Sequence, residues 1–182
     1  MKKSLVLASL LALSVSCAAS DSSKNWFIGI EGGTAELDFT VDGESYSVTD
    51  DSNYLSLKGG KYFGNSRIGI NYNFYNTEYG GDMSAYGVGY DYIFDIATSK
   101  LSPYVGVNIQ YASYEKLELN LNGISYGLGC GIMYEANKNF DIELGLKYNI
   151  DSGEDTVVED STVYEIALDN TIHIGIGINY NF

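Results

Sequence analysis

Residues 171–182 read Thr-Ile-His-Ile-Gly-Ile-Gly-Ile-Asn-Tyr-Asn-Phe, and this C-terminal stretch decides the fold. Large apolar side chains occupy every second position from Ile172 to Phe182, and small or polar ones lie between them. Because successive side chains of a β-strand point to opposite faces, the stretch predicts a strand with one apolar face. Its length matches the ~9–11 residues that a tilted membrane strand requires.

The same alternation runs back through the chain to Trp26, interrupted by clusters of Gly, Asn, Asp and Ser. It predicts seven further strands, and the resulting even number places both termini at one end of a closed sheet. The predicted strands are 25–40, 53–63, 66–75, 83–95, 102–115, 121–134, 139–150 and 172–182.

The face opposite the apolar rows indicates which way the sheet curls. It carries most of the 21 glycines together with a few long charged side chains. An eight-stranded barrel has an interior barely wide enough for side chains, and glycines make room there for charged ones. A soluble barrel would instead bury more tyrosine than its interior holds. The sequence therefore predicts an all-β fold, a closed antiparallel eight-stranded transmembrane β-barrel with its apolar rows toward lipid.

The predicted connections differ in length. Gly64–Asn65 and Glu135–Lys138 are short, whereas Val41–Ser52 and Asp151–Val163 are long. Outer-membrane barrels have short periplasmic turns and longer extracellular loops, so we assign the long connections to the cell surface.

Residues 1–20 have the pattern of a cleaved signal peptide. Two lysines precede the apolar run Leu5–Val15, and small residues follow it. Cleavage after Ala18 or after Ser20 fits equally, and Cys17 leaves lipoprotein processing as an alternative. Residues 21–182 are then expected to form a single outer-membrane β-barrel domain.

The charge and the scarcity of reactive side chains argue against several classes of function. Removing residues 1–20 lowers the formal net charge from −14 to −16, which opposes nucleic-acid binding. His173 is the only histidine, and no Ser-His-Asp set is recognisable around it, so we expect a structural histidine bonded to a neighbouring acid and no enzyme. Cys130 is predicted to face lipid, which leaves zinc without ligands. No cofactor and no metal are expected.

The final strand, which ends in Tyr180-Asn181-Phe182, resembles that of the small outer-membrane barrels typified by OmpA and OmpX. In that family the terminal aromatic residue is the signal that the barrel-assembly machinery reads, so the resemblance assigns this role to Tyr180 and Phe182. It also implies a multi-pass barrel in the outer membrane, surrounded by outer-membrane lipids and monomeric. It implies no particular ligand.

OmpA-like barrels hold paired acidic and basic side chains in the lumen, and this resemblance implies a plugged barrel here. Glu31 is expected to pair with Lys58, and Arg67 with Asp91, while two residues of a later strand reach across. Unpaired burial of such charges would be costly. An ion path gated by the pairs is the alternative. The predicted lumen charge network comprises Glu31, Lys58, Arg67, Asp91, Glu143 and Lys147.

The apolar row of the last strand continues towards its N-terminal side through Tyr164, Ile166 and Leu168, which keep the parity of Ile172. Such a strand exceeds the ~25 Å apolar band of these barrels. We therefore expect a projecting sheet, and by resemblance to OmpX its edge would capture partner strands at these three residues. A register change at Gly32–Gly33, plausible from the sequence, leaves the facing of the first strand's extension open.

The function expected from the sequence is a non-enzymatic surface barrel that serves envelope integrity or adhesion to a host or surface ligand through its extracellular loops. A narrow channel for ions or small solutes is the alternative. A lipid-modifying enzyme comes third, because the sequence lacks catalytic groups at the lipid face. The acidic outer loops are interpreted as solvated rather than as calcium sites, since the spacing of a calcium loop is missing.

Overall fold

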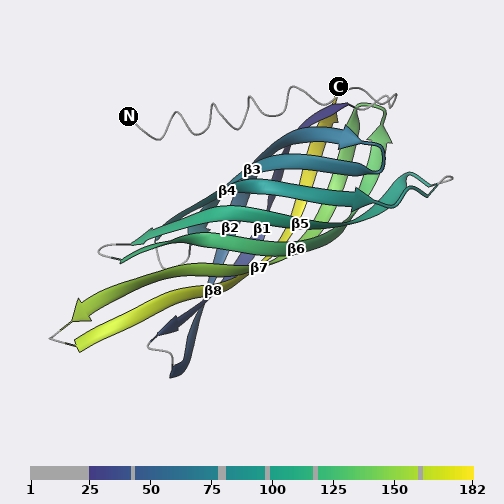
Figure 1. Cartoon of the computed structure of the whole chain (residues 1–182). Coiled ribbons are helices and arrows are strands. Elements are labelled where there is room, and N and C mark those ends of the chain that lie inside the picture. Colours follow the sequence, from purple (N-terminus) through teal and green to yellow (C-terminus); the bar gives the residue numbers. More distant parts are fainter. Residues whose placement is uncertain (1–24, 42–43, 78–80, 97–98, 117–118, 160–161) are drawn as a thin grey trace, which may run out of the picture.

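The computed structural model describes residues 25–41, 44–77, 81–96, 99–116, 119–159 and 162–182. Eight antiparallel strands close into one barrel, because β8 pairs with β1 as well as with β7 (Figure 1). Within these ranges no helix is long and apolar enough to span a membrane. The strands are β1 Trp26–Val41, β2 Glu44–Phe63, β3 Ser66–Thr77, β4 Asp82–Ile93, β5 Leu101–Lys116, β6 Leu119–Asn137, β7 Phe140–Glu159 and β8 Thr162–Asn181.

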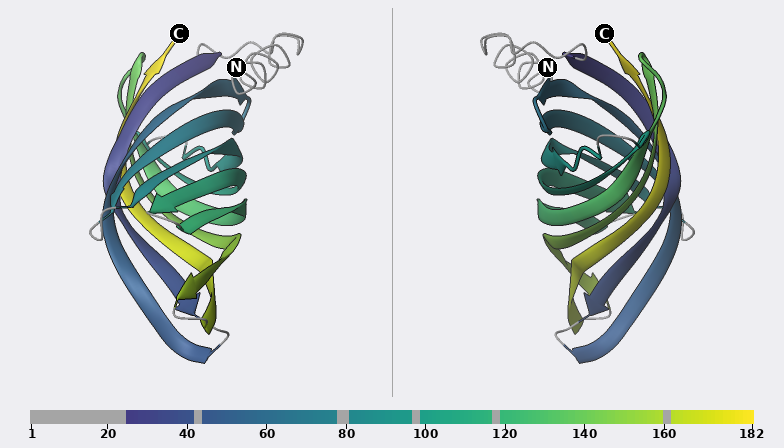
Figure 2. Two further views of the ribbon diagram at one scale, coloured as in Figure 1. Left: turned by 90° about the vertical axis from the view of Figure 1, so that its left-hand side faces the viewer. Right: turned by 90° about the vertical axis from the view of Figure 1, so that its right-hand side faces the viewer.

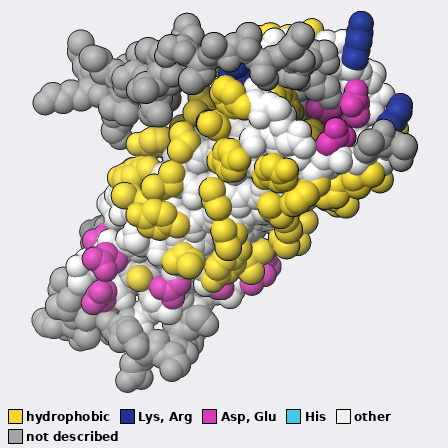
Figure 3. All heavy atoms as spheres, turned by 45° about the vertical axis from the view of Figure 1, so that its right-hand side comes forward, with side chains coloured by type: hydrophobic (Ala, Val, Ile, Leu, Met, Phe, Trp, Pro, Cys, Tyr) yellow, Lys and Arg dark blue, Asp and Glu magenta, His cyan; other side chains and the backbone are white. Residues whose placement is uncertain are grey.

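The apolar rows point outward, as the sequence predicts. In β8 the side chains of Ile174, Ile176 and Ile178 are 55%, 61% and 50% exposed, whereas His173 and Asn179 are buried in the lumen. On the face shown in Figure 3, hydrophobic side chains form a broad band across the middle of the molecule, with acidic side chains toward both ends. We call this band the belt. The predicted closed eight-stranded barrel is therefore confirmed.

At the end that holds Trp26 and Phe182, β2–β3 and β6–β7 are joined by short turns, whereas the connection from β4 to β5 spans residues 94–100. We assign this end to the periplasm. Gly64–Asn65 joins β2 to β3, and Gly64 has a φ of 60°, a backbone conformation that glycine adopts without strain. Trp26 and Phe182 exchange two backbone hydrogen bonds of 3.0 Å, which tie the first strand to the end of the chain.

At the opposite end the strands overrun the belt. The prediction of long loops at Val41–Ser52 and Asp151–Val163 is wrong, because β2 already begins at Glu44 and β7 continues to Glu159. Strands β1, β2, β7 and β8 thus extend past their neighbours as two long hairpins (Figures 1 and 2). We call this extension the projecting sheet.

At the outer end of the barrel the arrangement of side chains is the opposite of that in the membrane belt: apolar side chains face the lumen and polar ones face outward. Leu37, Phe39 and Leu168 of the projecting sheet are buried in the lumen, while Glu36 on the outward face is exposed. They pack with side chains from the opposite wall into a cluster that we call the outer apolar core. Its buried members are Ala35, Leu37, Phe39, Tyr54, Tyr75, Met83, Ala85, Ala112, Tyr114, Leu121 and Leu168.

The reversal arises differently in the two strands that meet at the closing seam. β1 pairs without interruption across Gly32–Gly33, so the register change considered there is absent and Phe39 simply falls on the inward parity. In β8, Asp169 is an extra residue opposite β1, since Asp38 pairs with Asn170 and Phe39 with Leu168. A bulge of this kind switches the facing of a strand.

That bulge corrects the prediction for the extended row of β8. Leu168 points into the lumen instead of continuing the outward row of Ile172, and Ile166 packs against the outer apolar core. The side chain of Tyr164 lies outside the described part of the structure, although its backbone pairs with Val157.

Candidate functional site: the charged lumen

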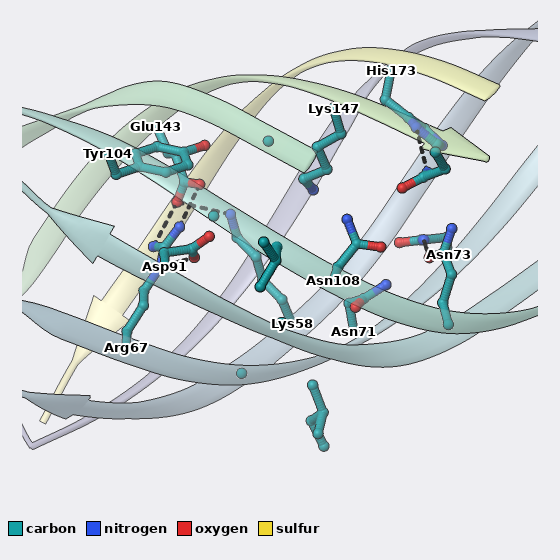
Figure 4. Close-up of a pocket in the computed structure, with 18 of the residues that line it drawn as sticks. Lys58, Arg67, Asn71, Asn73, Asp91, Tyr104, Asn108, Glu143, Lys147 and His173 are labelled. Carbon is teal, nitrogen blue, oxygen red and sulfur yellow. Dashed lines mark hydrogen bonds and ion pairs between the residues drawn. The ribbon is translucent and has the colours of Figure 1, made fainter. Parts of the chain in front are cut away.

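The structure brings all six predicted lumen charges together inside the belt. Figure 4 shows Lys58, Arg67, Asp91, Glu143 and Lys147. β1 to β4 each contribute one of these side chains, and β7 contributes two that lie four residues apart. Three carboxylates thus face three cations, so the network has no net formal charge. Its pairs are Lys58–Glu31 (2.9 Å), Lys58–Glu143 (2.9 Å), Arg67–Asp91 (2.6 Å), Arg67–Glu143 (2.7 Å) and Lys147–Glu31 (2.7 Å).

Arg67 is held on three sides. Its Nε donates to Asp91 Oδ2 at 2.6 Å, and its two terminal nitrogens donate to the two oxygens of Glu143 at 2.9 and 2.7 Å. The guanidinium also lies 5.0 Å from the ring centroid of Tyr104 and 5.5 Å from that of Phe27. Bidentate pairing and stacking are features that the planar guanidinium offers and an ammonium lacks.

Glu31 is the second centre of the network. It accepts hydrogen bonds from Lys58 (2.9 Å), Lys147 (2.7 Å) and the hydroxyl of Tyr54 (2.8 Å). The Tyr54 hydroxyl can reach Glu31 because residue 175 is glycine, since a Cβ at that position would collide with the hydroxyl. A buried carboxylate that receives three donors has much of its desolvation cost offset.

Sequence reasoning missed several uncharged members of the network. Tyr54 is buried in the lumen, where it contacts Glu31. Tyr54 lies four residues before Lys58 in the same strand, so the alternation alone places both side chains on the lumen face. Asn179 donates to Glu143 at 2.9 Å, and it too shares the inward parity of its strand.

His173 has neutral partners rather than the acid expected from the sequence. Its Nε2 lies 2.8 Å from the hydroxyl of Tyr75, and its Nδ1 lies 3.3 Å from the side-chain nitrogen of Asn149. Lumen acids have other partners: Glu31 pairs with Lys58 and Lys147. Asp151 accepts hydrogen bonds from the hydroxyls of Ser125 and Thr171.

The remaining predicted positions lie on the outer wall. Cys130 is exposed on the lipid-facing side. Tyr180 and Phe182 are also exposed there, with their rings stacked at 6.0 Å. The predicted signal peptide, residues 1–20, falls outside the described residues. Within those residues no group of three His, Cys, Asp or Glu side chains is placed to hold a metal ion.

Comparisons with known proteins agree with this architecture. Residues 5–182 match the family model described as outer membrane protein beta-barrel domain. No curated protein matches the sequence.

Solved structures share the fold at low sequence identity. Neisserial surface protein A superposes with a TM-score of 0.60 at 19% identity, covering 88% of this chain and 98% of its own. The outer membrane protein OprG from Pseudomonas aeruginosa gives 0.58 at 14% identity, covering 87% and 98%. The outer membrane protein AlkL gives 0.60 at 10% identity, covering 91% and 94%. The chain belongs to the outer membrane protein beta-barrel family.

Proposed function

We propose that this outer-membrane protein is a non-enzymatic barrel with a closed lumen, which makes contacts outside the cell through its projecting sheet. The projecting sheet carries the proposal, because an extension built on an apolar core is a rigid surface rather than a set of loose loops. The charge network supports a closed lumen, since three cations and three carboxylates neutralise one another where an open pore would be. Service to envelope integrity is compatible with the same surface.

The contact edge we favour is that of β2, not the row in β8 expected from the sequence. Ile166 and Leu168 pair with β1 on one side and β7 on the other, so their backbone is already used. Among the described residues the ladder of β2 with β3 ends at Ser52 and Thr77, whereas β2 itself continues outward to Glu44 as the edge strand of the projecting sheet. The edge strand of a sheet is a template for an extended partner strand.

The surroundings of that edge favour a basic partner. Glu36 and Asp51 lie directly opposite each other on β1 and β2, and both side chains are exposed. Like charges in this position destabilise a sheet, and a cationic partner would relieve the repulsion. Asp38, two pairs further out on the same face, adds a third carboxylate and accepts a hydrogen bond from Thr49 at 2.9 Å. We therefore propose an extended, positively charged peptide segment as the ligand.

Two matched deletions test this function. Replacing residues 40–47 by Asn-Gly shortens the β1–β2 hairpin while keeping Phe39 in the outer apolar core. Replacing residues 157–164 by Asn-Gly removes the same length from the β7–β8 hairpin. Non-adherent bacteria that display either variant should retain a heat-modifiable barrel on gels. Attachment to surfaces coated with basic peptides should fall only with the first deletion. Unchanged attachment with both would refute the proposed contact.

A narrow channel is the second candidate. Its support is that Lys147 is 31% exposed at the side chain and that a polar cavity lies beside it. Planar-bilayer recordings separate the two functions directly. The closed barrel predicts no steady current, and a large, stable conductance of the purified protein would favour the channel.

A further inference from the structure

A polar cavity of about 80 Å³ lies in the lumen between the charge network and His173 (Figure 4). Its lining includes Lys147 and the side-chain amides of Asn71, Asn108 and Asn149. The volume suffices for several waters, because one water needs ~10–15 Å³.

Two acceptors on the cavity wall have no hydrogen-bond partner in the described protein. They are the side-chain oxygens of Asn108 and Asn149, and both atoms are buried. Asn149 as a whole is 1% exposed, and its nitrogen is engaged with His173. Leaving a buried acceptor without a donor is costly, and water bridging is the usual remedy in a polar cavity.

Apolar layers lie on both sides of this cavity. The outer apolar core separates it from the cell surface, and seven of the eight strands contribute to that core. A second cluster lies toward the periplasmic end, and we call it the inner apolar layer. It consists of Phe27, Tyr62, Ile93, Tyr104 and Met133. Each layer also has a buried carboxylate at its level: Asp50 pairs with Leu37 of the outer core, and Asp141 accepts a hydrogen bond from Asn181 beside the inner layer. An ion that crosses either layer must give up its hydration to pass between the packed side chains, which is costly.

We propose that the lumen holds a water-filled chamber, sealed against ions by one apolar layer at each end. The inference rests on the closed lumen proposed above but adds that two seals act in series. The ion pairs then neutralise the chamber, while the apolar layers close it. The identity of any surface ligand plays no part in this argument.

Water-edited solid-state NMR of the protein in lipid bilayers tests for the waters. Magnetisation from water should reach the side-chain amides of Asn108 and Asn149, and it should not reach the lipid-facing methyl groups of Ile176. Absence of transfer to both amides would mean a dry lumen and would overturn the inference. The closed barrel would survive that result.

Charged thiol reagents test the seals. Asn71→Cys in a Cys130→Ala background places one thiol in the chamber. The charged reagents should leave it unmodified in proteoliposomes. Adding Phe39→Ala with Tyr114→Ala should open the outer seal and allow modification, yet planar bilayers should still show no current. Adding Tyr62→Ala with Met133→Ala as well should open the second seal and produce conductance.

The outcomes separate the inference from the proposed function. Modification of the otherwise unaltered Asn71→Cys protein would refute the closed lumen itself. Current after opening the outer seal alone would refute two seals in series but leave the native barrel closed. If the Asn71→Cys thiol still resists the charged reagents after the outer seal is opened, the inference is also overturned. Heat-modifiable gel mobility verifies folding, and Leu37→Ala with Leu121→Ala opens the same layer if the aromatic pair fails to fold.

Discussion

Glu143 gives the sharpest test of the lumen network. Its carboxylate is 1% exposed and accepts hydrogen bonds from Lys58, from both terminal nitrogens of Arg67 and from Asn179. Glu143→Gln leaves the ion-pair network with three cations against two carboxylates. Removing one partner of a buried ion pair typically costs ~3–5 kcal/mol, and we expect a loss of unfolding free energy in that range. Urea unfolding of the barrel refolded into lipid vesicles measures it.

A compensated variant isolates the cause. Lys58→Met combined with Glu143→Leu removes one charge of each sign and leaves Arg67–Asp91 and Lys147–Glu31 as intact pairs. The double variant should therefore lose less stability than the sum of the two single substitutions, with a coupling of ~0.5–3 kcal/mol. Glu36→Gln, on the exposed outer face, serves as the control and should change stability by no more than ~0.5 kcal/mol. Equal losses for Glu143→Gln and Glu36→Gln would refute the network as a stabilising unit.

Three further predictions concern other parts of the barrel. Phe39→Ala should cost ~3–5 kcal/mol in the same unfolding assay, because it removes a buried ring from the outer apolar core. Gly175→Ala should cost ~1–3 kcal/mol by displacing a tyrosine hydroxyl from a lumen carboxylate. Gly153→Ala meets only ordinary contacts and is its matched control. In the projecting sheet, the backbone amides of Asn120 and Thr156 hold the pKa of Asp155 below its usual 3.8. These bonds persist above that pKa and are lost as the pH falls through it, so the NMR shift of the Asn120 amide should titrate below pH 3.8, and Asp155→Asn should abolish the titration.

The alternation of the sequence was sufficient to predict the strands of the belt and their facing, because lipid outside and a narrow lumen inside impose opposite demands on neighbouring residues. Lys58 and Arg67 were assigned to the lumen by parity alone, and the structure places both there. Parity also puts Tyr54 in the lumen, whereas the preference of tyrosine for membrane–water interfaces would put it on the outer wall. In a strand, facing is a geometric constraint and the interfacial preference of a residue type is only a tendency.

The outer third of the barrel could not be derived in the same way. Val41–Ser52 and Asp151–Val163 are rich in acidic and small polar residues, which resembles loop composition. They form strands because their backbones pair with β1 and β8, the strands that carry Leu37, Phe39 and Leu168 of the outer apolar core. The bulge at Asp169 also cannot be predicted from the sequence. One extra residue reverses which side chains face the lumen, but it leaves the alternation of apolar and polar residues on either side unchanged.

In β1 the apolar side chains face outward in one part of the strand and inward in the other, because the strand passes from lipid into water. Ile28 and Ile30 face lipid from even positions, and Leu37 and Phe39 face the lumen from odd ones, while the ladder with β2 runs on without a break. The backbone therefore keeps its phase, and the apolar side chains change parity where hydrocarbon gives way to water. An apolar residue faces outward only as long as the outside is less polar than the inside. The position at which its parity changes thus marks the outer boundary of the membrane, between Ile30 and Leu37. Spin labels at Ile30 and Glu36 should accordingly report lipid and water, respectively, and water accessibility at Ile30 would contradict the assignment.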